Sequence, residues 1–212
     1  SFERTILLGN EPSAEKYIAL SSSSGSRKDW RRLFRRLAET GRVETRVLQP
    51  GSDAQPWIEA FLKVEVSGWK GREGTALASH PQEEAYFREI ALAAQARSAL
   101  HMAGLFVDGR PIALQCNLFA HGQGSAFKVT YDEAWAQYSP GVLLELEAIR
   151  DLYVRPGFIS MDSCTGRNHP LMNRLWRDTR RIVRCRVATH GAGAALLALQ
   201  PAVEFLGRRR KQ

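Results

Sequence analysis

Apolar side chains recur at helical spacing early in the chain, on a segment whose other positions are strongly basic. Trp30, Leu33, Phe34 and Leu37 fall at i, i+3, i+4 and i+7. The spacing predicts a helix that Ser26 caps and that ends at Gly41. Its opposite face carries arginines at positions 31, 32, 35 and 36, suited either to plain solvation or to contact with phosphates or an acidic partner.

The same spacing predicts two further helices, over about 54–66, with Asp53 as the candidate cap, and over about 82–97. Residues 21–25 are rich in serine and are expected to form a loop. Residues 43–48 are expected to form a strand that ends at the following Pro-Gly pair.

From residue 100 the apolar pattern changes to a period of two, which is typical of strands. Strands are predicted over 100–107 and 110–119, joined at Asp108-Gly109, a pair that favours a type I′ turn. A second turn over 121–124 leads to a strand over 125–131, which completes an antiparallel meander. On that last strand Phe127, Val129 and Tyr131 are expected to face the core, and Lys128, Thr130 and Asp132 to face the other way.

After the meander the helical period returns at Ser139-Pro140-Gly141, and a strand is predicted over 158–162. A strand, helix, strand sequence of this kind normally joins parallel strands. Glu145 and Glu147 are expected on the exposed face of the helix. A helix over 168–178, a strand over 182–187 and a helix over 194–206 follow, so the predicted fold class is α/β with a mixed sheet.

The formal net charge of +8 is concentrated in three stretches, residues 27–42, 174–186 and 208–211. The aromatic side chains within them are only Trp30, Phe34 and Trp176, whereas nucleic-acid binding favours several aromatic side chains among the cations. A general nucleic-acid binder is therefore not expected. No apolar run approaches the length of a membrane span, and no secretory signal is visible, which favours a cytoplasmic protein.

The three cysteines are at wide spacing, as for reduced thiols in the cytosol, and Cys116 and Cys185 are expected to be structural. The histidines at 101, 121 and 169 are scattered and show no metal-ligand spacing, so no metal is expected.

Ser139-Pro140 has the preferred order for a helix start, a hydroxyl at the cap and proline at the first position. The exposed N–H groups of Gly141, Val142 and Leu143 can bind a phosphate or simply water.

Three strings, in the same order, resemble the acyl-CoA N-acyltransferase (GNAT) superfamily, in its branch of CelD-like and Fem-type proteins. They are Gly68 to Leu77 (GWKGREGTAL), Phe127 to Asp132 (FKVTYD) and Tyr138 to Gly141 (YSPG). The similarity covers about residues 20–190. It implies that residues 1–48 are the tail of a preceding GNAT-like half, residues 49–190 the acyltransferase domain, and residues 191–212 a C-terminal helix and basic tail.

The resemblance implies acyl transfer, most simply acetyl transfer, from acetyl-CoA or another acyl-CoA to a small-molecule or cell-envelope amine by direct attack. The pyrophosphate would lie at the helix start, on Tyr138, Ser139, Pro140, Gly141, Val142 and Leu143. This stretch departs from the usual superfamily pattern, because it offers one glycine. Fem-type relatives use aminoacyl-tRNA instead, and a scaffold or an anion-binding module without activity is a further alternative.

Acyl transfer to an amine needs a base, stabilisation of an oxyanion and an acid. Asp132, at the end of its strand and on the same face as Lys128, is the candidate base; for both residues the alternative is a charge that meets another surface element. Tyr131 and Tyr138 are candidate acids that could equally only pack. By resemblance Trp69 and Lys70 belong to the acceptor pocket, and Asp162 ends the parallel strand where ligands gather in α/β sheets.

Overall fold

The computed structural model describes residues 1–166, 169–183, 185–191, 193–194 and 198. The chain divides into two units, one of Glu3–Arg180 and one of Ser1–Phe2 with Arg181–Gln212. The unit of Glu3–Arg180 contains the helices α1 to α7 and the candidate site. None of the helices within the described ranges is long and apolar enough to cross a membrane.

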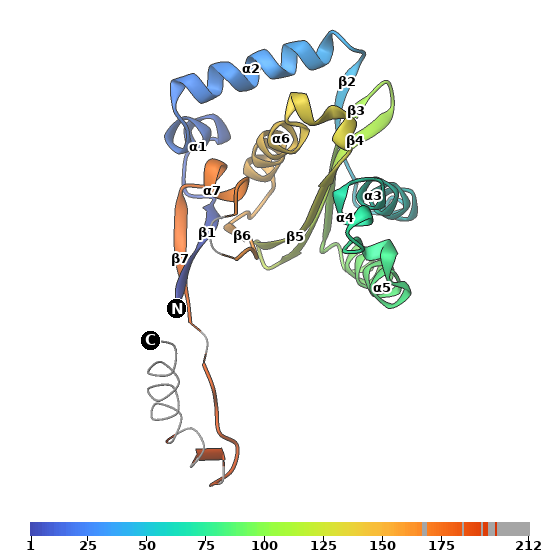
Figure 1. Ribbon diagram of the computed structural model, residues 1–212. Coiled ribbons are helices and arrows are strands. Elements are labelled where there is room, and N and C mark those ends of the chain that lie inside the picture. The colour runs from blue at the N-terminus through green and yellow to red at the C-terminus, as the bar shows by residue number, and fades with distance from the viewer. Residues whose placement is uncertain (167–168, 184, 192, 195–197, 199–212) are drawn as a thin grey trace, which may run out of the picture. The chain divides into compact units, whose positions relative to one another are not determined.

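A seven-stranded mixed sheet organises the fold (Figure 1). The strands follow the order β2-β3-β4-β5-β6-β1-β7. They comprise β1 (Phe2–Leu8), β2 (Val43–Val47), β3 (Leu100–Val107), β4 (Arg110–Ala120), β5 (Gln123–Tyr131), β6 (Ser160–Asp162) and β7 (Asp178–Ile182). The strands from β2 to β5 pair antiparallel, β5 and β6 pair parallel, and β6 pairs antiparallel with β1. The mixed α/β sheet and the predicted crossover are therefore confirmed.

Helices cover both faces of the sheet (Figure 1). On one face α6 (Pro140–Val154) packs with α1 (Ala14–Ser21), α2 (Ser24–Ala38) and the short α7 (Met172–Leu175). On the other face lie α3 (Gln55–Ser67), α4 (Trp69–Arg72) and α5 (Pro81–Ala96). Two 3₁₀ turns, η1 (Leu77–Ser79) and η2 (Glu133–Tyr138), complete the described elements. Each face has its own core, with Leu144 and Ile149 central to the first and Phe61 and Phe87 to the second.

Local turn chemistry produces the meander as predicted. Asp108 and Gly109 have φ angles of 48° and 79°, as a type I′ turn requires. His121 and Gly122 repeat this arrangement with 50° and 76°. The second turn is therefore only two residues long, and β5 begins at Gln123, two residues earlier than expected.

Several helix boundaries differ from the prediction because side chains cap other positions. The Oγ of Ser23 accepts the Ser26 N–H over 3.0 Å, so α2 begins at Ser24 and Ser26 is not its cap. Residue 21 ends α1, which shortens the expected serine loop. Ser139 precedes α6 but has a left-handed φ of 52° and makes no side-chain cap bond.

The predictions for the end of the chain were partly wrong. α7 ends at Leu175 because Trp176 is extended, at φ −107° and ψ 125°, and its buried indole turns back to α6. The last strand accordingly comes earlier than expected, at 178–182. Most of the helix predicted over 194–206 lies outside the described residues. Cys116 is buried, which raises the pKa of its thiol to about 12, whereas Cys185 is exposed and not part of a core.

Both β1 and β2 belong to residues 1–48, yet they lie in the same sheet as the strands of residues 49–190. Residue 48 therefore marks no break in the sheet. That residues 1–48 are the tail of a preceding half stays a prediction.

Candidate functional site

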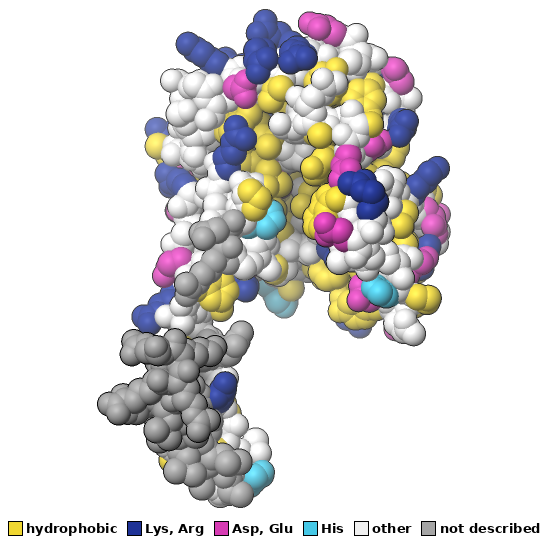
Figure 2. All heavy atoms as spheres, viewed as in Figure 1, with side chains coloured by type: hydrophobic (Ala, Val, Ile, Leu, Met, Phe, Trp, Pro, Cys, Tyr) yellow, Lys and Arg dark blue, Asp and Glu magenta, His cyan; other side chains and the backbone are white. Residues whose placement is uncertain are grey.

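A cleft opens where the two parallel strands separate. β5 and β6 pair only from Gln123 to Ser125, opposite Ser160 to Asp162. Beyond this point β6 ends, while β5 continues to Tyr131. The cleft at the separation has a volume of about 190 Å³. Among the described residues it is lined by Lys70, Gln115, Asn117, Ala126, Phe127, Lys128, Val129, Ser163, Cys164, Thr165, His169 and Met172. Figure 2 shows the surface hollowed between the side of the molecule with β1 and α7 and the side with α3 to α5.

The start of α6 is open to a ligand at Gly141, but two of its N–H groups already have an acceptor. A Cβ added to Gly141 would meet only the Tyr131 ring, at 4.0 Å. The N–H groups of Val142 and Leu143, however, both donate to the Ser139 carbonyl, over 2.9 and 3.2 Å. Pro140 is buried and lacks an N–H. The fit to a pyrophosphate therefore rests mainly on the open approach at Gly141, and this binding role stays a prediction.

Aromatic side chains surround this helix start. Tyr131 packs against the core beside α6, and Tyr138 contacts Trp135 with ring centroids 5.9 Å apart. The guanidinium of Arg36 on α2 lies 5.9 Å from the centre of the Tyr138 ring. Tyr138 thus joins the basic helix to the predicted cofactor site, and the acid roles of the two tyrosines stay predictions.

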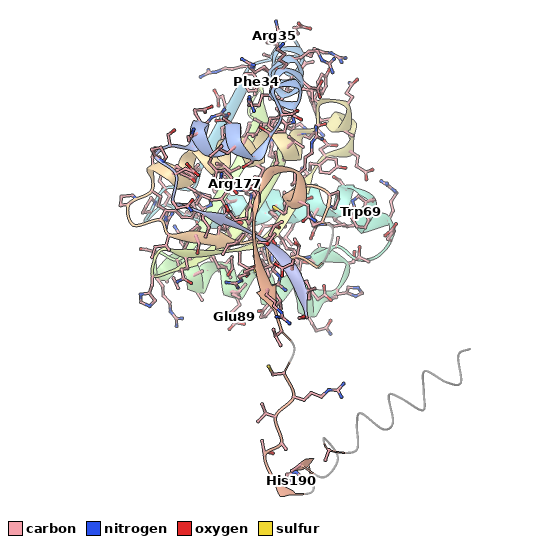
Figure 3. The ribbon with its side chains drawn as sticks, turned by 90° about the vertical axis from the view of Figure 1, so that its left-hand side faces the viewer. Phe34, Arg35, Trp69, Glu89, Arg177 and His190 are labelled. Atoms are coloured by element: carbon pink, nitrogen blue, oxygen red, sulfur yellow. The ribbon has the colours of Figure 1, made fainter. Side chains whose placement is uncertain are left out.

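The short helix α4 carries Lys70 toward β5. A Cβ on Gly71 would lie 1.8 Å from the Val66 carbonyl oxygen, so only glycine permits this close turn after α3. The carboxylate of Glu133 holds the turn in place, since it accepts the Trp69 N–H over 2.9 Å and the Arg72 guanidinium over 2.8 Å. Trp69 itself projects outward and is 44% exposed (Figure 3).

Lys70 meets a buried carboxylate and the open edge of β5. Its Nζ lies 3.1 Å from Oε1 of Glu65 and donates to the Val129 carbonyl, also over 3.1 Å. Lys128 from β5 reaches the same Oε1 over 3.3 Å. The predicted acceptor residue Lys70 and the predicted catalytic residue Lys128 are thus brought together at the cleft.

A β-bulge changes which β5 side chains share a face. The register with β4 shifts between Cys116 and Asn117, opposite Phe127. Phe127 therefore packs on Phe87, on the same side of the sheet as Lys128. The strict alternation predicted for Phe127, Val129 and Tyr131 was wrong at Phe127.

Asp132 and Asp162 both make structural contacts. Asp132 pairs with Arg110 over 2.6 Å and caps η2 by accepting the Ala134 N–H over 3.0 Å; it is not among the described residues that line the cleft. Asp162 is buried, pairs with Arg4 and Arg180, and accepts the Cys164 N–H over 2.7 Å. The predicted roles of Asp132 in catalysis and Asp162 in substrate binding stay predictions.

The structure adds two residues that sequence reasoning did not select, one that lines the cleft and one buried behind its lysines. His169 lines the cleft, and burial together with the charge of Lys70 lowers the pKa of its imidazole. Its Nδ1 accepts the Met172 N–H over 3.3 Å, which places the proton of the neutral ring on Nε2. No local pattern distinguishes this histidine. The sequence did indicate Glu65, because a charged residue within the apolar stripe of a helix must find partners when it is buried.

No group of three or more His, Cys, Asp or Glu side chains in the described part of the chain is arranged to hold a metal ion.

The fold agrees with a sequence match to a known family. Residues 24–169 match the family model described as an acetyltransferase (GNAT) domain. The match covers more than half of the chain, which therefore belongs to this family.

Solved structures show the same fold at low sequence identity. The crystal structure of FemX aligns with a TM-score of 0.58 at 10% identity, over 82% of this chain and 58% of that one. A conserved protein of unknown function from Bacteroides thetaiotaomicron aligns with a TM-score of 0.50 at 15% identity, over 76% of this chain and 49% of that one. The chain thus spans about half the length of these two proteins. No curated protein matches its sequence.

Proposed function

We propose that this domain transfers an acyl group from acyl-CoA, most simply acetyl-CoA, to an amine by direct attack. The observation that supports this most is the separation of β5 from β6. The cleft leaves the edge of β5 open next to two lysines and a histidine. A thioester in the cleft would meet donors along that edge, and its nucleotide would extend toward Gly141.

The chemistry needs no covalent enzyme intermediate. The amine nitrogen attacks the thioester carbon, the carbon–sulfur bond breaks, and the thiolate leaves with a proton while the nitrogen loses one. Binding the thioester end of the donor and the amine in one cleft supplies the proximity on which such a reaction depends.

Mass spectrometry of products from acetyl-CoA and a panel of amines tests the proposal. This readout is preferable to a thiol reagent, because Cys164 and Cys185 are exposed and would react as well. We expect an acetylated amine to accumulate with a matching amount of free CoA. Calorimetry should show CoA binding to the full chain. The absence of both CoA binding and turnover would contradict the proposal.

A second candidate donor is aminoacyl-tRNA. It is favoured by the basic face of α2, where exposed Arg31, Arg32 and Arg35 lie on the helix whose Arg36 reaches Tyr138. Figure 2 shows Lys and Arg side chains gathered over this helix. Transfer of a radiolabelled amino acid from charged tRNA, with no use of acetyl-CoA, would favour this donor.

A further inference from the structure

The carboxylate of Glu65 is fully used by its neighbours. The side chain has no exposed surface. Its Oε1 receives the ammonium groups of both Lys70 and Lys128, and its Oε2 accepts the Leu77 N–H over 2.9 Å. Glu65 therefore holds both lysines in place but balances only one of their two charges.

The second positive charge has no acidic partner within the described residues. Neither lysine forms an ion pair there with any carboxylate other than Glu65. Burial and, after it, the charge of Lys70 lower the pKa of His169, which lines the same cleft. The cleft therefore carries an excess of one positive charge from its two lysines.

Both ammonium groups are accessible from the cleft and keep donor capacity. The two side chains are 24% and 26% exposed, and both line the cleft. An ammonium has three donors. Lys70 uses two of them, on Glu65 and Val129, and Lys128 uses one, on Glu65. Each lysine can therefore donate to a bound anion without leaving Glu65.

We propose that Lys70 and Lys128 bind a carboxylate of the acyl acceptor, so that the acceptor is an amine that also carries a carboxylate, as amino acids do. The inference rests on the proposed function. A singly charged carboxylate matches an excess of one positive charge, whereas a phosphate dianion would leave the cleft negative. The cleft of about 190 Å³ also suits a small acceptor.

Acceptor pairs in which an amide replaces the carboxylate provide the test. The rates of acetylation of L-amino acids and of the corresponding amino-acid amides are measured with the full chain and acetyl-CoA at constant ionic strength. We expect kcat/KM to favour the acids by about tenfold or more, the range for a hydrogen bond to a charged group. In Lys128→Met the preference should fall close to one, because Lys70 still pairs with Glu65 and the excess charge is gone.

Lys63→Met is the matched control, since it removes an exposed lysine from the helix that carries Glu65. It should behave as wild type. Equal use of acids and amides by the wild type would overturn the inference and would show instead that the excess charge acts on the thioester oxygen alone.

Calorimetry with N-acetylglycine and N-acetylglycinamide separates this inference from the proposed function. Binding of N-acetylglycine that is at least about tenfold tighter than that of the amide, and lost in Lys128→Met, would support the carboxylate site even if CoA did not bind. Binding of CoA together with equal binding of the two glycine compounds would sustain the proposed function and refute the carboxylate site.

Discussion

The indole N–H of Trp176 donates to Oε1 of Glu145 over 2.9 Å, and both side chains are almost completely buried. Glu145 was expected on the exposed face of α6, and that expectation was wrong because α7 and Trp176 cover this part of the helix. Burial raises the pKa of the Glu145 carboxyl to about 7, although the bond from Trp176 opposes the shift.

This raised pKa predicts how stability depends on pH. The carboxyl titrates near its ordinary 4.5 in the unfolded chain and near 7 in the folded protein, so the folded state holds the proton more tightly. The stability that the protonated Glu145 carboxyl contributes is fully present below pH 4.5 and is lost as the pH rises through 7. Glu145→Gln should therefore gain about 1–3 kcal/mol of unfolding free energy relative to wild type between pH 4.5 and pH 8.

Urea unfolding at several pH values measures this difference. Glu147→Gln is the control, because Glu147 is partly exposed and pairs with Arg150 at the surface. Parallel stability profiles for wild type and Glu145→Gln would contradict the assignment of the buried, protonated carboxyl.

Removing the carboxylate between the two lysines should destabilise the fold. Glu65→Ala leaves two ammonium groups facing each other and the Leu77 N–H without its acceptor, at a cost of about 2–4 kcal/mol. Glu65→Gln keeps an acceptor for that N–H and should cost about 1–2 kcal/mol. Chemical unfolding measures both values, with the exposed Glu59→Gln on the same helix as a control that should change little. Equal stability of Glu65→Ala and wild type would show that the lysines find solvent instead.

A side chain at Gly141 should impair cofactor binding more than folding. The space around a Cβ at this position is open apart from the Tyr131 ring at 4.0 Å, so the fold has room for valine. The same side chain would stand where a pyrophosphate must approach the helix start. We expect Gly141→Val to raise the Kd for CoA about tenfold or more with little change in Tm. Glu147→Gln should leave the Kd unchanged, and equal calorimetric affinities of all three proteins would place the phosphates elsewhere.

Asp132→Asn separates the two roles of this side chain. Asparagine caps a helical turn as well as aspartate does, so the bond to the Ala134 N–H can persist while the charge is lost. If Asp132 is the general base, turnover should fall by about 10² or more while Tm changes little. Unchanged turnover would leave Asp132 as the cap of η2 and the partner of Arg110 only. His169→Gln, assayed alongside, reports on the imidazole that lines the cleft.

The parts of the fold that could be predicted are those that neighbouring residues determine. Asp108-Gly109 specifies a turn whatever surrounds it, and the meander followed from such turns. The bulge at Phe127 and the burial of Glu145 depend on what packs against them, and no local pattern reports this.

The residues of the site differ in the same way in how far the sequence alone could predict them. Lys70 and Lys128 were selected separately, from two strings 58 positions apart. What joins them is Glu65, whose charge within an apolar helical stripe indicated that a partner was needed but not which one. His169 belongs to no periodic pattern in the sequence, so its place in the cleft could not be anticipated.

The position of β1 in the sheet has a consequence for the order of events during synthesis. Ile6 pairs with Asp162, so β1 leaves the ribosome about 150 residues before the strand with which it pairs. At about 5–20 residues per second, β1 waits roughly 10–30 s for β6 to appear. During that time the apolar residues of β1 lack the strand that pairs with them in the folded sheet. The pairing of β1 with β6, which closes the sheet, therefore has to follow the synthesis of β6.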